Sequence, residues 1–320
     1  MSLIKAIPLT CTGHSRPVTH LTFSGQLPPS SPFDYTLISA CKDGNPMLRN
    51  GVTGDWIGTF LGHKGAIWCS RISEFGDLAV TGSADFTANV WNVSNGQPII
   101  SVKHGHIVRS ADLVVASGSR TGRLVTGGQD KLVKVWSFPS GEKELEWDMG
   151  SPVRSTIWIS STLLVVASLD GTISWWDVSS SSPTKLKELK VEMPFMQLEK
   201  KGNVLLIAAA NSAYVLDSAS GEITRQINLD YKISAFALNR DGTQFLTGMS
   251  EDTWVRLHDY ASTDLLDTYK GHHGPVHSIA YSPDGAIAAT GSEDGTIRLW
   301  KMVGGNYGLW SKPAEKEGFF

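Results

Sequence analysis

Short stretches of alternating apolar and polar residues recur along the whole chain, each followed by a turn rich in glycine, aspartate, proline or serine. The clearest copy lies near the C-terminal end, where Val276–Tyr281 alternates and the turn 282–285 follows it. Further strands are predicted over 286–291 and 296–300, with a tight Asp-Gly turn between them. This period belongs to strands and not to helices, so the pattern predicts an all-β protein.

The same order of strands and turns repeats seven times. The equivalent turn position falls at residues 43, 85, 130, 170, 211, 252 and 294, so successive copies lie 40 to 45 residues apart. A four-stranded blade of a WD-repeat propeller has this period. The sequence therefore predicts an all-β, seven-bladed WD-repeat β-propeller, a single domain over 1–310 followed by a short C-terminal tail over 311–320.

The start of the chain indicates how the ring closes. Residues 4–12 precede the first Gly-His pair, Gly13-His14, and so resemble an outer strand without inner strands of its own. The seventh repeat has three inner strands and needs an outer one. We expect the N-terminal strand to complete blade 7, which closes the ring and leaves only short strand edges.

Four polar or aromatic positions recur in the repeats: a histidine after glycine, a hydroxyl residue, the turn aspartate and a tryptophan. Complete sets are assigned to blades 2, 3 and 7, namely His63, Thr81, Asp85 and Trp91; His106, Thr126, Asp130 and Trp136; and His272, Thr290, Asp294 and Trp300. Blade 1 has the first three but carries Arg49 at the tryptophan position, and blades 4 to 6 lack the Gly-His pair.

A histidine, a hydroxyl and an aspartate are also the groups of a catalytic triad. Three copies of one triad would be unusual in a single enzyme domain, whereas WD-repeat families use these side chains for a hydrogen-bonded chain inside the blade. Such a buried chain is stabilising when complete and costly when broken. We therefore expect structural residues, no catalytic residues and no cofactor. The pair His272-His273 lacks a third ligand at metal-site spacing, so no metal is expected either.

Composition and charge exclude several classes of binding partner and indicate the cellular compartment. The formal net charge is −3 without a large block of one sign, which argues against a binder of duplex nucleic acid or of a membrane surface. Three cysteines without a C-x-x-C pair favour a reducing compartment. The chain shows no signal-peptide pattern and no apolar run long enough for a membrane span. We expect a cytoplasmic protein, with the nucleus as a second location.

A narrower signal lies in the first two repeats and at the end of the chain. The segments are SACKDGNPMLR at 39–49, TGDWIGTFLGHKGA at 53–66, TGGQDKL at 126–132, and the stretch from 269 to 310. They resemble the serine-threonine kinase receptor-associated protein family. The resemblance covers the full chain, is densest over 36–91 and 268–310, and is loose in blades 4 and 5.

The resemblance implies a non-enzymatic adaptor. Members of that family resemble a subunit of the survival motor neuron complex, which loads Sm proteins onto small nuclear RNA. The implied partners are Sm-type proteins or survival motor neuron complex subunits, together with an RNA-binding protein, so that RNA contact is indirect. No small-molecule substrate is implied. The alternative is the i-subunit of the translation initiation factor, which has a similar start of blade 2. The run Asp55–Phe60 and the missing blade-1 tryptophan favour the first family.

Partners of propellers usually dock on the face that carries the Gly-His and Asp loops. The fifth residue after the histidine is expected to point toward the centre of that face: Thr19, Trp68, Arg109, Arg154, Met196, Ser234 and His277. Exposed tryptophan and arginine are enriched at binding hot spots. The sequence predicts a basic and aromatic partner-binding sector formed by Lys42, Lys64, Trp68, Arg109, Lys131 and Arg154.

Overall fold

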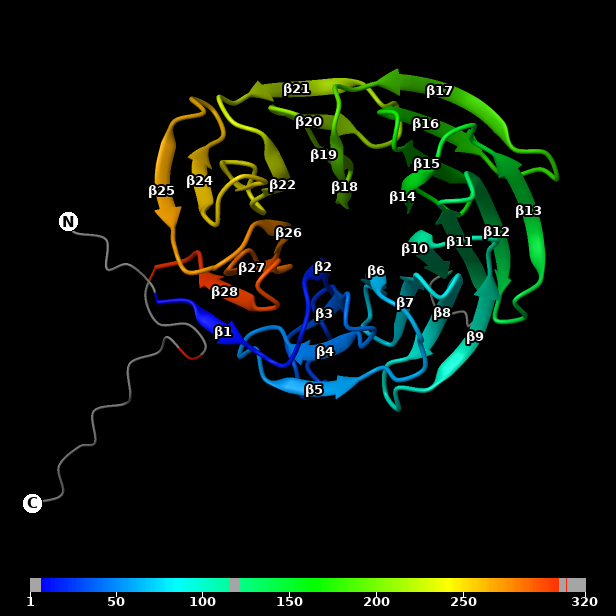
Figure 1. Cartoon of the computed structure of the whole chain (residues 1–320), viewed down its shortest axis with the longest axis horizontal. Coiled ribbons are helices and arrows are strands. Elements are labelled where there is room, and N and C mark those ends of the chain that lie inside the picture. The colour runs from blue at the N-terminus through cyan, green and yellow to red at the C-terminus, as the bar shows by residue number, and fades with distance from the viewer. Residues whose placement is uncertain (1–6, 116–120, 305–308, 310–320) are drawn as a thin grey trace, which may run out of the picture.

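The computed structural model describes residues 7–115, 121–304 and 309. Within these residues the chain forms 28 β-strands and no α-helix. The strands form seven antiparallel sheets of four strands each, arranged as blades around a common centre (Figure 1). The predicted seven-bladed propeller is therefore confirmed. The predicted tail, 311–320, lies outside the described residues.

Blade 1 comprises β2–β5, and the next five blades follow in groups of four strands up to β25. The strands of blades 1 to 4 are β2 Val18–Phe23, β3 Thr36–Cys41, β4 Met47–Asn50, β5 Trp56–Thr59, β6 Ile67–Ile72, β7 Leu78–Ser83, β8 Thr87–Asn92, β9 Pro98–Lys103, β10 Val108–Val115, β11 Gly122–Gly128, β12 Leu132–Phe138, β13 Lys143–Asp148, β14 Val153–Trp158, β15 Leu163–Ser168, β16 Thr172–Asp177 and β17 Thr184–Lys190. Those of blades 5 to 7 are β18 Phe195–Lys201, β19 Val204–Ala209, β20 Ser212–Asp217, β21 Ile223–Asn228, β22 Ile233–Leu238, β23 Gln244–Met249, β24 Val255–Asp259, β25 Leu265–Tyr269, β26 Val276–Tyr281, β27 Ile287–Ser292, β28 Ile297–Lys301 and the N-terminal β1 Leu9–Cys11.

Blade 7 joins the two ends of the described chain. Its strand order is β1-β28-β27-β26, and β1 pairs antiparallel with β28 through Leu9↔Leu299 and Cys11↔Ile297 (Figure 1). This confirms the predicted closure of the ring by the N-terminal strand; of the expected range 4–12, β1 comprises Leu9–Cys11, and residues 4–6 lie outside the described residues. Closure pairs the edge of β28 that would otherwise be open.

The apolar core lies between neighbouring blades. One cluster joins Trp175 of blade 4 to Phe195 and Tyr214 of blade 5, and another joins Tyr35 of blade 1 to Leu299 of blade 7. Successive side chains of a strand point to opposite faces of its blade. Because each blade has a neighbouring blade on both sides, both faces of its inner strands are buried. The blades therefore hold their inner strands, β2, β6, β10, β14, β18, β22 and β26, in fixed positions around the centre (Figure 1).

Candidate functional site

In blade 2 the four repeat side chains form one hydrogen-bonded chain. Nδ1 of His63 lies 2.9 Å from Oδ2 of Asp85, and its Nε2 lies 2.7 Å from Oγ1 of Thr81. The indole Nε1 of Trp91 donates to the same Thr81 hydroxyl at 2.8 Å. The carboxylate can only accept, so it orients the imidazole with the proton on Nδ1, and the threonine hydroxyl donates to Nε2.

Blade 7 repeats this geometry with His272. Its Nδ1 lies 3.1 Å from Asp294, its Nε2 lies 2.7 Å from Thr290, and Trp300 donates to Thr290 at 2.8 Å. Burial tends to raise the pKa of Asp294, but the hydrogen bonds from His273 and Thr296 outweigh burial and lower it to about 2. Burial lowers the pKa of His272, so the pair consists of a carboxylate and a neutral imidazole.

The assignment of His106 to the blade 3 set was wrong. The histidine in that chain is His104, which lies 3.0 Å from Asp130 and 2.7 Å from Thr126, while Trp136 donates to Thr126. His106 is exposed and its ring lies tilted against that of Phe86, with ring centroids 5.4 Å apart. The sequence Lys103-His104-Gly105-His106 contains a Gly-His pair out of register. The spacing in the sequence identifies His104, because Arg109 is the fifth residue after His104, as Trp68 is the fifth residue after His63.

Two blades use a different polar arrangement. In blade 1, His14 binds Asp43 and Ser39, and Arg49 occupies the tryptophan position with its guanidinium on the carbonyls of Gly54 and Thr12. In blade 6, His258 takes the tryptophan position and shares the Tyr231 hydroxyl with Thr247, at 2.8 and 2.7 Å. Sequence reasoning missed this second arrangement because it searched for Gly-His pairs.

One group with metal-ligand chemistry occurs among the described residues: His14, Cys41 and Asp43, whose ligand atoms lie within 4.8 Å of one another. Both ring nitrogens of His14 already take part in hydrogen bonds. Burial raises the pKa of the Cys41 thiol to about 12, whereas a metal ligand would be the thiolate. This group therefore fits the hydrogen-bonded chain of blade 1 better than a metal centre.

A β-bulge in every inner strand positions the centre of the face. The register shifts at the same point in all seven blades, for example between Ile67 and Cys69 in blade 2 and between Val153 and Ser155 in blade 4. A bulged residue is released from strict alternation and its side chain is redirected. The seven bulge residues line one cavity of about 250 Å³ at the mouth of the central channel: Thr19, Trp68, Arg109, Arg154, Met196, Ser234 and His277.

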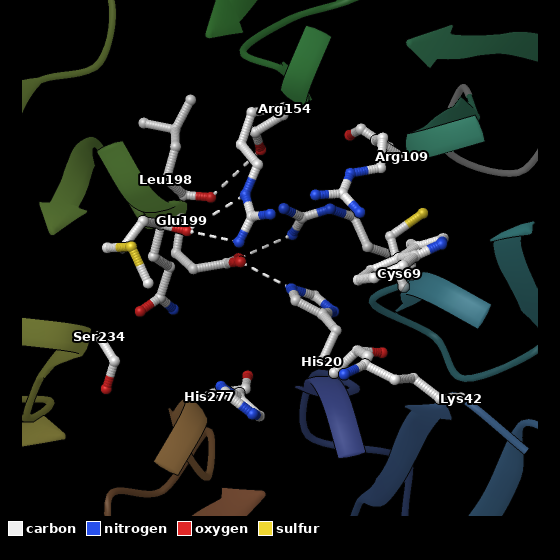
Figure 2. A pocket seen from close by; sticks show the side chains of 17 residues that line it. His20, Lys42, Cys69, Arg109, Arg154, Leu198, Glu199, Ser234 and His277 are labelled. Atoms are coloured by element: carbon white, nitrogen blue, oxygen red, sulfur yellow. Dashed lines mark hydrogen bonds and ion pairs between the residues drawn. The ribbon is translucent and has the colours of Figure 1, made fainter. Parts of the chain in front are cut away.

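Only some of the cations in the predicted partner-binding sector lie together at the channel mouth. Arg109 stacks over Trp68 with its guanidinium carbon 3.9 Å from the ring centroid, and the Lys42 nitrogen lies 5.8 Å from the same centroid. Arg154 lies beside Arg109 in the next blade and donates to the Met196 carbonyl at 3.0 Å (Figure 2). Burial and the neighbouring Arg154 lower the pKa of Arg109 to about 10, so Arg109 remains charged at neutral pH.

Lys64 and Lys131 differ from these four residues. Neither is among the described residues that line the cavity, and both are exposed on turns of blades 2 and 3. The backbone nitrogen of Lys64 donates to Asp85, and Lys131 has a φ of 69° in the turn after Asp130. The structure therefore places these two lysines on the loops and not at the channel mouth.

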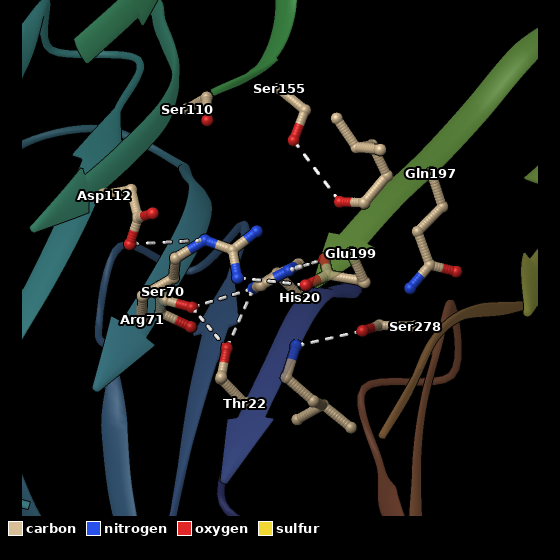
Figure 3. Close-up of polar contacts among 12 residues, drawn as sticks. His20, Thr22, Ser70, Arg71, Ser110, Asp112, Ser155, Gln197, Glu199 and Ser278 are labelled. Atoms are coloured by element: carbon tan, nitrogen blue, oxygen red, sulfur yellow. Dashed lines mark hydrogen bonds and ion pairs between the residues drawn. The ribbon is translucent and has the colours of Figure 1, made fainter. Parts of the chain in front are cut away.

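A network of partly buried charges lies across the channel, and three of its residues, His20, Arg71 and Glu199, line the same cavity. Glu199 of blade 5 lies 2.7 Å from His20 of blade 1 and 3.0 Å from Arg71 of blade 2, and Arg71 lies 3.9 Å from Asp112 of blade 3 (Figure 3). Burial tends to raise the pKa of Glu199, but Arg71 and His20 outweigh burial and lower it to about 2. Arg71 therefore has two carboxylate partners within the protein. Sequence reasoning missed the four residues of this network, although three of them lie three residues after a bulge position.

Comparison with known proteins agrees with this geometry. The family described as "WD domain, G-beta repeat" matches residues 54–92, 96–137 and 263–301. These stretches end at the tryptophan-bearing strands of blades 2, 3 and 7, which are the three blades with a complete chain of His, Thr, Asp and Trp. The repeats that a general signature detects are thus those with the complete polar chain.

Whole-chain relatives decide the family. The serine-threonine kinase receptor-associated proteins of Rattus norvegicus and Homo sapiens are each 39% identical over 98% of this chain and 89% of their own length. The protein of that name from Dictyostelium discoideum is 38% identical over 92% of this chain and 98% of its own length. The chain belongs to the serine-threonine kinase receptor-associated protein family. Eukaryotic translation initiation factor 3 subunit I of Bombyx mori is a more distant relative, with 25% identity over 91% of this chain.

As a member of the serine-threonine kinase receptor-associated protein family, the chain is a WD-repeat scaffold whose fold is typical of protein–protein interaction. Over the part of the chain that the structure describes, no helix has the length and apolar character to cross a membrane. At the channel mouth, Arg109 and Arg154 form no ion pair with a carboxylate among the described residues.

Proposed function

We propose that this protein is a non-enzymatic adaptor in the survival motor neuron complex-type assembly of spliceosomal small nuclear ribonucleoproteins. Its partners are Sm-type proteins or subunits of that complex, and RNA is reached through an RNA-binding partner. It acts in the cytoplasm and in the nucleus. The identity of 39% to serine-threonine kinase receptor-associated proteins, against 25% to the initiation factor subunit, supports this choice.

The observation that supports an adaptor role is the convergence of Lys42, Trp68, Arg109 and Arg154 at one mouth. Stacked arginine and tryptophan side chains are typical of binding hot spots, where they combine apolar contact area with directional donors. Arg71 deeper in the channel already has carboxylate partners, whereas Arg109 and Arg154 have no ion pair to a carboxylate within the described residues. A protein partner with acidic groups would supply the missing charges.

The histidine sets favour a structural role over catalysis. Each imidazole uses both nitrogens in hydrogen bonds, and each threonine hydroxyl already accepts from an indole, as in His63, Thr81 and Trp91. A nucleophile needs a free path to substrate, but Thr81 and Thr290 are fully buried. The proposal therefore assigns no chemistry to them.

A scaffold role in translation initiation is the second candidate, and the similarity to subunit I of initiation factor 3 is the observation that favours it. Affinity purification of the tagged protein with mass spectrometry separates the two. We expect Sm proteins and survival motor neuron complex subunits among the specific partners. Recovery of initiation factor 3 subunits without them would support the second candidate and overturn the first.

A triple variant tests whether the partners in the pull-down bind through the channel mouth. Trp68→Ala, Arg109→Glu and Arg154→Glu together should leave the melting temperature close to that of the wild type, because none of the three belongs to a blade hydrogen-bonded chain. The same variant should lose the specific partners in the pull-down. Full recovery of the partners by a correctly folded triple variant would contradict docking at this mouth.

A further inference from the structure

Arg109 presents an unused edge at the channel mouth. Its guanidinium face lies on the Trp68 ring at 3.9 Å, which fixes the plane of the group but uses none of its N–H donors. Within the described residues, no hydrogen bond or ion pair involves these donors. A guanidinium held by its face retains a planar fork that matches the two oxygens of a carboxylate.

Two further donors in the same cavity lack acceptors. Nε2 of Gln197 and Nε1 of Trp68 are buried and have no hydrogen-bond partner among the residues that the structure describes. Gln197 is 8% exposed, and its other amide atom, Oε1, accepts from the Phe236 backbone at 2.8 Å. Buried donors without acceptors are costly, so these two atoms add unpaired donor capacity to the wall of the cavity.

The turns beside Arg109 carry an independent signal. The residue after the turn aspartate has a left-handed backbone in several blades, and it is glycine in blades 1, 4 and 7, with φ between 77° and 87°. In blades 2 and 3 the same position holds Phe86 and Lys131, with φ of 71° and 69°. Bulky residues are strained in this conformation, and strain of this kind concentrates at functional sites.

Phe86 is 42% exposed and its ring contacts that of His106 at a tilt of 33°; His106 lies three residues before Arg109 on the adjoining loop. The fold would be less strained with glycine at position 86, so the aromatic ring there serves something other than the fold. It places an exposed aromatic ring against the loop that leads into β10, the strand of Arg109. The combination suits a protein segment in which an apolar residue neighbours an acidic one.

We propose that the channel mouth binds an acidic segment of a partner protein, with a side-chain carboxylate on the free edge of Arg109 and a neighbouring apolar residue on the Phe86–His106 pair. A carboxylate fits better than a phosphate because Arg154 already uses two of its donor groups on the Met196 carbonyl. The mouth thus has one complete fork and not the several converging forks that a phosphate favours. The proposal rests on the adaptor role only in that the ligand belongs to another protein.

Direct binding to the purified full-length chain tests this. The probe is a fluorescein-labelled glycine-serine peptide with a central Glu-Phe-Glu, measured by fluorescence anisotropy against the same peptide with Gln-Phe-Gln and with phosphoserine replacing each glutamate. We expect saturable binding of the glutamate peptide that weakens with salt, and no saturable binding of the glutamine peptide. Absence of binding of the glutamate peptide, or equal binding of both, overturns the proposal.

Variants locate the site. Arg109→Gln should weaken the glutamate peptide roughly tenfold and Arg109→Lys several-fold, because lysine keeps the charge but not the fork. The matched control is Lys232→Gln, which removes one positive charge from an exposed loop of blade 6 and should change the dissociation constant by less than about twofold. An Arg109→Gln effect no larger than that of the control overturns the assignment, as does Arg109-dependent binding that is tighter for the phosphoserine peptide.

Phe86→Gly separates binding from folding. Relief of the left-handed strain should leave the melting temperature unchanged or higher, whereas peptide affinity should fall. A lower melting temperature with unchanged affinity would show that Phe86 is structural and would overturn its part of the proposal. The peptide assay contains no complex subunits, so its outcome is independent of which partners the cellular pull-down recovers.

Discussion

Blades 7 and 4 have equivalent strand order and register, but the tryptophan of the third strand has a different hydrogen-bond partner in each blade. Trp300 pairs with Ala288 in blade 7 as Trp176 pairs with Leu164 in blade 4. In blade 7 the indole donates to Thr290, which also binds His272. In blade 4 the threonine position is held by the fully buried Val166, and the indole of Trp176 turns to Ser174 at 2.7 Å.

The histidine position differs in the same way. In blade 4 it is occupied by Met149, which packs against the apolar cluster that also contains Val166 and Trp158. A buried polar pair can be replaced by apolar groups at little cost when both partners change together, whereas removal of one partner leaves the other unsatisfied. Blades 7 and 4 thus show two alternative interiors for one blade geometry, and of these two only blade 7 matches the general repeat signature.

The largest expected effect on stability concerns the outer strands of the two blades. The outer strand of blade 4, β17, directly follows β16, whereas that of blade 7 is β1 from the other end of the chain. Deletion of residues 1–12 should therefore expose the edge of β28 and cause aggregation or loss of cooperative unfolding. The measurement is size-exclusion chromatography with a thermal melt. Addition of a peptide covering 4–14 should restore part of the stability by strand addition. A monomeric truncation with an unchanged melting temperature would refute closure by β1.

The second-largest expected loss of stability comes from replacing polar residues of blade 7 with the residue types of blade 4. Thr290→Val should lower the free energy of unfolding by about 1–3 kcal/mol for each group it leaves unsatisfied, here His272 Nε2 and Trp300 Nε1. The double variant His272→Met with Thr290→Val should lose less than the sum of the two single variants. The coupling in urea unfolding should be about 0.5–3 kcal/mol. Strict additivity would show that the chain does not act as a unit.

The turn aspartates provide a matched pair. Asp294→Ala should cost about 1–3 kcal/mol because it removes the acceptor for His272, the backbone of His273 and Thr296. Asp170 occupies the same turn position in blade 4 but is exposed, and it contacts only Thr172 and Lys190 among the described residues. Asp170→Ala should cost about 0.5 kcal/mol or less. Equal losses of stability in the two variants would contradict the structural role of the polar chain.

Acid should weaken the polar blades in two steps. The pKa of His63 and His272 lies below the usual 6.5 in the folded protein because of burial, so their contribution is lost as pH falls below about 6.5. Burial opposes the shift at Asp85 and Asp294, but their hydrogen bonds lower both pKa values to about 2, so a second loss follows as pH falls from about 4 toward 2. Urea midpoints between pH 8 and pH 3 measure this. A protein that becomes more stable between pH 7 and pH 5 would oppose the assignment.

The sequence predicted the seven blades and the closure because the turn aspartate and the strand pattern recur even where the polar chain is absent, as at Asp170. It also placed Trp68 and Arg109 at the mouth, since the inner strand begins at a fixed distance from the histidine. The channel network could not be predicted in this way. His20 and Glu199 lie 179 residues apart and meet only because the ring brings blades 1 and 5 across a common channel.

The smallest expected effect concerns the histidine that the sequence pattern chose wrongly. His104 is 7% exposed and connects Asp130 to Thr126, so His104→Ala should cost about 1–3 kcal/mol by leaving both partners unsatisfied. His106 is exposed, and its Nδ1 accepts only from the adjacent Ile107 backbone among the contacts of the described chain. His106→Ala should therefore change stability by less than about 0.5 kcal/mol. Urea unfolding of the two alanine variants, which differ by two positions in one loop, decides the register of blade 3. If His106→Ala were the more destabilising of the two, the histidine would have to reach Asp130 from the other side of Gly105, and the inner strand would shift with it.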